Sequence, residues 1–120
     1  MQRNMDLVRM ILMRMETSPA GWANDDLGIK SFSSQEVFHH AHIMIQEGLI
    51  ERDETTGLKS VPTSLTWKGH EFLDLARDQE RWNRAKAIIA KVGGAPISVW
   101  MKVLTDLTMQ GVDTAASRSN

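Results

Sequence analysis

Apolar residues near the start of the chain recur at steps of three and four, which is the spacing of one helix face. The pattern predicts a helix from about Met5 to Glu16, followed by the helix-ending segment Thr17–Gly21. The segment Trp22–Ser31 shows no helical period, although Leu27–Ile29 within it has the pattern of a short strand. The residues that share the apolar face are Leu7, Val8, Ile11, Leu12 and Met15.

A second helix is predicted over about Ser34–Glu47, and both of its ends are encoded locally. Ser33 is a favoured N-cap residue, and Glu36, three positions later, completes a capping box. Gly48 supplies the left-handed residue at which many helices end. The inward stripe of this helix contains Val37, Ala41, Met44 and Ile45, with Phe38 at its edge.

Two short segments after this helix predict an antiparallel β-hairpin. Leu49–Arg52 has the pattern of the first strand, and Asp53–Gly57 contains the residue types of a turn. Ser64–Thr66 has the pattern of the returning strand, and Pro62 beside it fits the edge of a sheet.

Two apolar stripes with helical spacing follow the hairpin. Thr66 is expected to cap a helix that continues to Val92 and ends at Gly93. The stripes are rotated relative to each other around the charged segment Arg77–Arg81. One continuous helix is the preferred interpretation, and a break at the charged segment is the alternative. The first stripe contains Phe72, Leu75 and Ala76, and the second contains Trp82, Ala85, Ile89 and Val92.

A last amphipathic helix is predicted to begin at Ser98, which is a favoured capping residue. Trp100 and Leu104 lie on its apolar face, and Gly111 is expected to end it. We assign residues 1–110 to a single domain and expect residues 111–120 to form a disordered tail. The fold class is therefore mainly α with a small antiparallel β-hairpin.

The apolar faces of the last two helices need a cover, which predicts self-association of the chain. Two copies could cover each other's faces as helices do in bundles, which would give a homodimer. The alternative is that the two faces pack against each other within one chain. The residues assigned to this contact are Trp82, Ala85, Ile89, Val92, Trp100 and Leu104.

Composition and charge exclude several classes of protein. The chain of 120 residues has 14 basic and 15 acidic residues, so no global field attracts it to nucleic acid or anionic lipid. The absence of cysteine excludes a disulfide framework and thiolate metal sites. No apolar run approaches the roughly 20 residues of a membrane helix, and the charged N-terminal segment is a poor signal peptide. We expect a cytoplasmic protein.

The blocks "IQEGLIERD" and "SLTWKGHEFL" resemble the hairpin of winged-helix regulators in bacteria. With "RNMDLVRMIL" and "RWNRAKAIIAKVGG", the chain resembles a group of small phage and prophage proteins, the domain-of-unknown-function family numbered twenty-five thirteen. The resemblance extends from about Arg3 to Gln110. It implies a winged-helix-like fold and a bacterial host cell, and it brings no catalytic residues. Unlike the usual regulator, this chain lacks an obvious supporting helix between Gly21 and Phe32.

The outward side of the second helix is the candidate binding surface for a partner protein. This helix has no lysine or arginine, whereas helices that read DNA usually present such residues to bases and phosphates. Its outward residues are polar and largely uncharged around one isoleucine, which is typical of a protein contact. The alternative is that Trp22 or Leu27–Ile29 covers Ile43, so that the row is an ordinary core edge. The candidate residues are Gln35, His39, His42, Ile43 and Gln46.

DNA binding is the alternative function, and it would use Arg52 and Lys59 in the wing, the loop of the hairpin. The pair His39 and His42, completed by His40, Glu36 or His70, is too small a signal for zinc, so we predict no metal and no cofactor. The tryptophans at 67, 82 and 100 lie on packing stripes and are expected in the core.

The sequence contains no nucleophile–base pair, carboxylate pair or phosphate loop, so we do not expect an enzyme. The preferred function is a phage- or prophage-type interaction module that binds a host or phage protein, such as a regulatory or defence complex. The alternative is a winged-helix transcriptional regulator.

Overall fold

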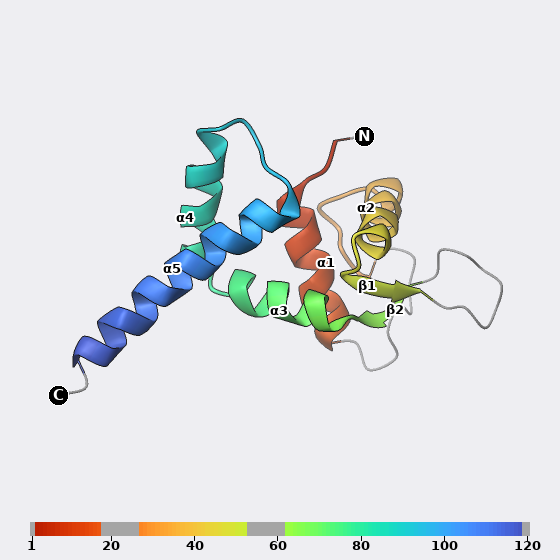
Figure 1. The fold of residues 1–120 in the computed structure, drawn as a ribbon. Helices are drawn as coiled ribbons and strands as arrows, with labels where there is room; N and C mark the ends of the chain where they lie inside the picture. The colour runs from red at the N-terminus through yellow and green to blue at the C-terminus, as the bar shows by residue number, and fades with distance from the viewer. Residues whose placement is uncertain (1, 18–26, 53–61, 119–120) are drawn as a thin grey trace. The chain divides into compact units, whose positions relative to one another are not determined.

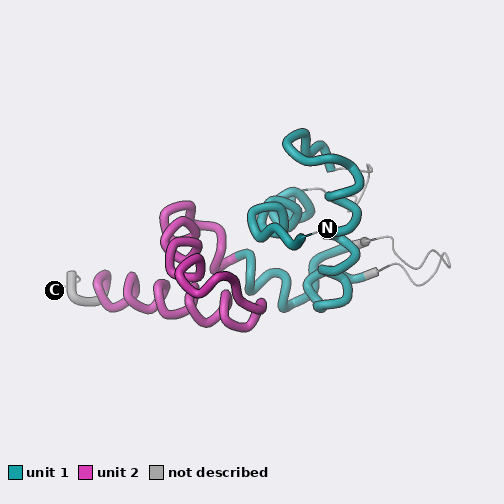
Figure 2. Tube along the Cα trace, turned by 90° about the horizontal axis from the view of Figure 1, so that it is seen from above, with its two compact units in different colours: residues 1–73 teal, residues 74–120 magenta. Residues whose placement is uncertain are grey.

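The computed structural model describes residues 2–17, 27–52 and 62–118, with backbone alone at 52, 62, 63 and 116–118. These residues form five helices and one two-stranded antiparallel sheet (Figure 1), which confirms the mainly α class with a β-hairpin. Every helix among them is too short or too polar to cross a bilayer. The chain divides into two compact units, Met1–Leu73 and Asp74–Asn120 (Figure 2), where the sequence analysis assigned one domain.

Helix α1, Met5–Thr17, confirms the first predicted helix. Asn4 caps it, because the side-chain oxygen Oδ1 accepts a hydrogen bond from the Leu7 amide at 3.2 Å. The predicted apolar face lies inward, and α1 packs against α2 and β2. The buried residues of α1 are the five that the spacing selects, Leu7, Val8, Ile11, Leu12 and Met15.

Helix α2, Ser34–Gln46, has the two caps that its sequence predicts. The Ser33 hydroxyl accepts from the Glu36 amide at 3.1 Å, and the Glu36 carboxylate accepts from the Ser33 amide at 3.3 Å. At the other end Gly48 has a φ of 83°, and its amide donates to the carbonyl of Ile45. The Leu49 amide donates to the carbonyl of Met44 at 2.9 Å, which completes a Schellman motif.

The predicted hairpin is confirmed by strands β1, Ile50–Arg52, and β2, Pro62–Leu65. Ile50 pairs with Leu65, and the register shifts between Glu51 and Arg52. The short strand expected at Leu27–Ile29 is wrong. Leu27 and Gly28 have φ values of 54° and 74°, so the chain turns there, and the buried Ile29 follows the turn.

Thr66 joins the end of α2 to the start of α3, Trp67–Ala76. Its hydroxyl oxygen accepts from the Gly69 amide at 3.0 Å, as an N-cap does, and the same hydroxyl donates to the carbonyl of Gly48. Its amide donates to the carbonyl of Leu49 at 3.1 Å. A side chain at Gly69 would collide with that carbonyl oxygen. The block "EGLI…LTWKG" therefore encodes one close junction of α2, the hairpin and α3.

The continuous helix expected over residues 67–92 is wrong, and the alternative is right. The chain leaves helical geometry at Arg77 and Asp78, and a new helix α4 spans Gln79–Ala90. Asp78 starts it by accepting from the Arg81 amide at 2.8 Å. The Arg81 guanidinium donates to the carbonyl of Leu75 at 3.2 Å, which satisfies one acceptor at the end of α3.

Helix α5, Ile97–Arg118, begins earlier and ends later than the sequence predicted. The carbonyl of Pro96 accepts from the amides of Val99 and Trp100, so Ser98 lies in the first turn and is not the cap. Gly111 does not end the helix. A glycine inside a helix costs only about 1 kcal/mol relative to alanine and does not by itself stop it. Residues 111–118, assigned to a disordered tail, are helical.

Candidate functional site

The exposed side of α2 contains the predicted binding residues in two groups. Gln35, His42 and Gln46 are exposed, whereas His39 and Ile43 are half-buried. The Gln46 side-chain amide donates to the Nε2 atom of His42 at 3.3 Å, so these two side chains support each other. All five residues therefore lie on α2, but Ile43 contributes little to its exposed surface because it is half-buried.

Phe38 is the main apolar group on this side of α2. Its side chain is 43% exposed, although the sequence analysis placed it at the edge of the inward stripe. With 3.6 residues per turn, positions 35, 38, 39, 42 and 46 lie within a sector of about 100° around the helix axis, so they form a single strip. We define the outer face of α2 as Gln35, Phe38, His39, His42 and Gln46.

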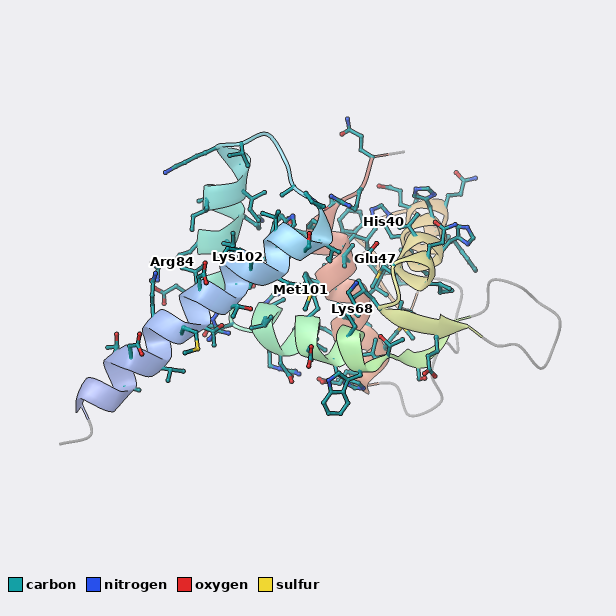
Figure 3. The ribbon with its side chains drawn as sticks, in the orientation of Figure 1. His40, Glu47, Lys68, Arg84, Met101 and Lys102 are labelled. Atoms are coloured by element: carbon teal, nitrogen blue, oxygen red, sulfur yellow. The ribbon has the colours of Figure 1, made fainter. Side chains whose placement is uncertain are left out.

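His40 bonds α2 to the start of α1, whereas from the sequence it was considered only as a further ligand of a metal site. It is 1% exposed, and Figure 3 labels it on α2. Its Nε2 accepts from the Asn4 amide at 2.8 Å, so Nδ1 carries the proton and donates to the carbonyl of Glu36 at 2.8 Å. The signal was present in the spacing, because His40 shares the helical period of Val37, Ala41 and Met44.

The electrostatic character of the outer face follows from its composition. None of its five residues is lysine, arginine or a carboxylate. At the C-terminal end of α2, Lys68 donates to both the carbonyl and the side chain of Glu47, each at 3.2 Å (Figure 3). Lys68, which follows the returning strand by three positions, is therefore paired with Glu47. Of the predicted DNA contacts, Arg52 lies on β1 without a described side chain, and Lys59 lies outside the described residues.

Trp67 corrects the expectation that its side chain belongs to the core. It is 81% exposed, and its indole N–H donates to the Oε1 atom of Glu71 at 2.7 Å. The inward side of α3 is occupied by Gly69, Phe72 and Leu73, which are buried. Position 67 lies roughly opposite these residues around the helix, so the side chain points to solvent.

The histidines considered for metal binding occupy different environments. His39 and His42 lie on α2, His70 is exposed on α3, and both ring nitrogens of His40 are hydrogen bonded. The His39 and His40 rings meet edge to face with centroids 5.7 Å apart. Within the described part of the chain, no group of three or more histidine, aspartate or glutamate side chains converges as metal ligands would.

The residues assigned to self-association pack within one chain in unit 2. The Trp82 and Trp100 rings stack with centroids 4.9 Å apart, joining α4 to α5. Val92 differs from the other residues of this set, because it is 72% exposed. Self-association stays a prediction, but five of the six residues assigned to it are already buried within a single chain. The buried ones are Trp82, Ala85, Ile89, Trp100 and Leu104.

Unit 2 also contains an open cleft of about 840 Å³ beside the second half of α5. Charged residues of both signs at the start of α4 form one wall, and uncharged residues of α5 between Leu107 and Ala115 form the other. Arg84 is exposed on the charged wall (Figure 3). The mixed charges give the cleft no clear preference for an anion or a cation.

Comparison with known proteins identifies the relatives of this chain. The profile of the family described as "Hypothetical protein (DUF2513)" matches residues 2–96. A protein of Haemophilus influenzae (strain Rd), named "Uncharacterized protein", is 37% identical over 93 residues, which cover 74% of this chain and 79% of that protein. No solved structure matches the chain. The matched region includes α1, α2, the hairpin, α3 and α4, so the chain belongs to the DUF2513 family.

Proposed function

We propose that this protein is a non-enzymatic binding module that contacts another protein through the outer face of α2. The observation that carries the proposal is Phe38, which is 43% exposed among uncharged polar side chains. Aromatic side chains are enriched in protein interfaces, and charged residues are depleted from the interface core. The outer face of α2 has this composition.

The rigid position of α2 also supports a contact surface. The helix is capped at both ends, and His40 bonds it to the start of α1. A surface that is already ordered loses little conformational entropy when it binds. The partner can therefore meet the outer face without a rearrangement of this helix.

The resemblance to phage and prophage proteins suggests the setting of this contact. We propose that the module acts in the cytoplasm of a bacterial host and binds a host or phage protein. A regulatory or defence complex is a suitable target, because a small binding module can change the activity of such a complex by occupying one surface.

Substitution of Phe38 by Asp tests the contact. The variant and the wild type would each capture proteins from bacterial lysate treated with nuclease, and quantitative mass spectrometry would compare them. We expect Phe38→Asp to lose specific partners by at least about tenfold, because an interface anchor is replaced by a charge. Ile88→Asp is the matched control, because Ile88 is also 43% exposed but lies on α4. Equal capture by both variants would reject the outer face of α2.

DNA binding is the second candidate, and the succession of capped helix and β-hairpin favours it. On that hypothesis Arg52→Glu and Lys59→Glu should remove most affinity for a DNA fragment. Binding should also fall steeply with salt, because phosphate contacts release counterions. On the protein-binding proposal, both charge reversals leave capture unchanged. A salt-sensitive gel shift that Arg52→Glu abolishes and Phe38→Asp preserves would replace the proposed function with DNA binding.

A further inference from the structure

Trp67 is the most exposed of the large apolar side chains in the described part of the chain. An indole that is 81% exposed leaves much apolar surface in water, which is unfavourable for the free protein. Tryptophan is also among the residue types that contribute most binding energy at interfaces. The exposure of Trp67 therefore leaves an indole surface available to a partner.

The backbone on both sides of Trp67 is fixed. Thr66 bonds to Gly48 and Leu49, and Gly69 lies directly against the carbonyl of Leu49. The indole itself is oriented by the hydrogen bond from Nε1 to Glu71 at 2.7 Å. This bond lies in the plane of the ring, so it leaves the ring face uncovered.

The local charge favours a cation as the group that covers the indole. Glu71 brings a carboxylate to the edge of the ring through its Oε1 atom. Lys68, the next residue in the chain, donates to the side chain and to the carbonyl of Glu47, the C-cap of α2. Lys68 is thus directed to α2, and its charge is balanced there.

We propose that Trp67 and Glu71 bind an arginine side chain of a partner protein. A guanidinium can stack on the electron-rich face of an indole, and its planar shape suits this contact better than an ammonium does. The same guanidinium can donate hydrogen bonds to the carboxylate of Glu71 at the ring edge. A nucleic acid fits this surface less well, because Glu71 repels phosphate. The site is a second surface, and it does not rest on the outer face of α2.

Nuclear magnetic resonance of the indole N–H groups tests the site with the whole chain. A Trp67→Phe variant assigns the Trp67 resonance, and its spectrum shows whether the fold is retained. The probe is a short peptide of alternating arginine and serine. We expect a saturable shift of the Trp67 resonance with this peptide, a weaker response to the lysine analogue and none to the glutamate analogue.

Substitution of Glu71 by Gln separates the carboxylate charge from the hydrogen bond. Glutamine keeps an acceptor for the indole N–H, so the ring orientation is retained while the negative charge is lost. We expect the affinity for the arginine peptide to fall about fivefold or more. Glu80→Gln, which removes an exposed carboxylate from α4, should leave the affinity unchanged.

Three results would overturn the proposal. One is the absence of a saturable shift with the arginine peptide. Another is an equal shift with the glutamate peptide, which would indicate contact with the apolar ring alone. The third is a saturable shift with oligothymidine, which would assign Trp67 to base stacking. Because Trp67 is 81% exposed, Trp67→Phe is expected to fold, and the resonance that it assigns is followed in the wild-type and Glu71→Gln titrations.

Discussion

At the scale of single residues, His40 determines which side of α2 faces the solvent. Its two ring nitrogens bond to Asn4 and Glu36, so α1 and α2 are joined by a polar contact inside the protein. The Asn4 amide belongs to the N-cap of α1, where a glutamate or glutamine at the third helical position often supplies the acceptor. In α1 the third helical position is Leu7, whose side chain cannot accept a hydrogen bond. The Asn4 amide donates instead to His40 of α2.

Replacement of His40 by Phe tests this contact. We expect the free energy of unfolding to fall by about 1–3 kcal/mol, because the Asn4 amide loses its acceptor in a part-buried place. Chemical denaturation followed by circular dichroism measures the change. His42→Phe, at an exposed position of the same helix, should change the value by less than about 0.5 kcal/mol. Equal losses would mean that the two hydrogen bonds of His40 contribute nothing specific.

Gly69 gives a second prediction at this scale. Gly69→Ala should cost about 3 kcal/mol or more, because the added methyl group collides with the main-chain carbonyl of Leu49. Gly111→Ala is the matched control in a helix. Among the described residues, no atom outside its own stretch of helix lies within 4 Å of the added methyl group, so this variant should gain up to about 1 kcal/mol. Thermal unfolding compares the two variants. A wild-type melting temperature for Gly69→Ala would show that the backbone around Leu49 can shift to accommodate the methyl group.

Sequence periodicity predicted residue positions better than it predicted their partners. All five apolar residues selected on α1 are buried, because burial follows directly from the helical period. One partner of His40, the Asn4 amide, is 36 positions away, and no local pattern contains that information. Trp67 was assigned to a packing stripe and therefore to the core, although its position on α3 lies opposite the buried Gly69 and Phe72.

At the scale of elements, some helix ends are determined by residues close in the sequence, and others by contacts in three dimensions. Both ends of α2 were predicted, because Ser33, Glu36 and Gly48 act on backbone groups a few residues away. The break before α4 and the length of α5 were not predicted correctly. At the break, two side-chain hydrogen bonds replace those that a continuous helix would make. Asp78 accepts from the Arg81 amide, and the Arg81 guanidinium donates to the carbonyl of Leu75. Whether the broken or the continuous helix is more stable depends on three-dimensional contacts that the spacing of apolar residues does not show.

Substitution of Ser33 by Ala tests the capping box of α2. The change removes the acceptor for the Glu36 amide, so we expect a loss of about 1 kcal/mol in the free energy of unfolding. Ser34→Ala is the control, because Ser34 is the exposed first residue of the helix. Urea denaturation distinguishes the two variants. A Ser33→Ala midpoint equal to that of Ser34→Ala would contradict the assigned cap.

At the scale of the whole molecule, the two compact units differ in their relation to the family. The family match ends at residue 96, just before α5 begins at Ile97. Trp82 of the matched region nevertheless stacks on Trp100 of α5. In this chain, α5 therefore packs on an apolar face of α4, and α4 lies within the region that matches the family.

Loss of the Trp100 ring tests the dependence of α4 on α5. Trp100→Ala should destabilise unit 2 by about 3–5 kcal/mol, because it leaves the Trp82 ring without its stacked partner. Hydrogen exchange should become faster at the α4 amides and stay unchanged in α2. Equally fast exchange in both helices would show that the two units unfold together. Light scattering of the same samples shows whether exposed Trp82 then drives self-association.

The base of the β-hairpin has a consequence for engineering this protein. Thr66 ties the end of β2 to Gly48 and Leu49, the two residues that precede β1. The ends of the connecting segment are thus brought together by contacts that lie outside that segment. The entropic cost of closing a chain segment between fixed ends grows slowly with its length, by only about 0.6 kcal/mol for each doubling. A short epitope inserted between Arg52 and Pro62 should therefore be accepted with little loss of stability, which makes this place suitable for labelling.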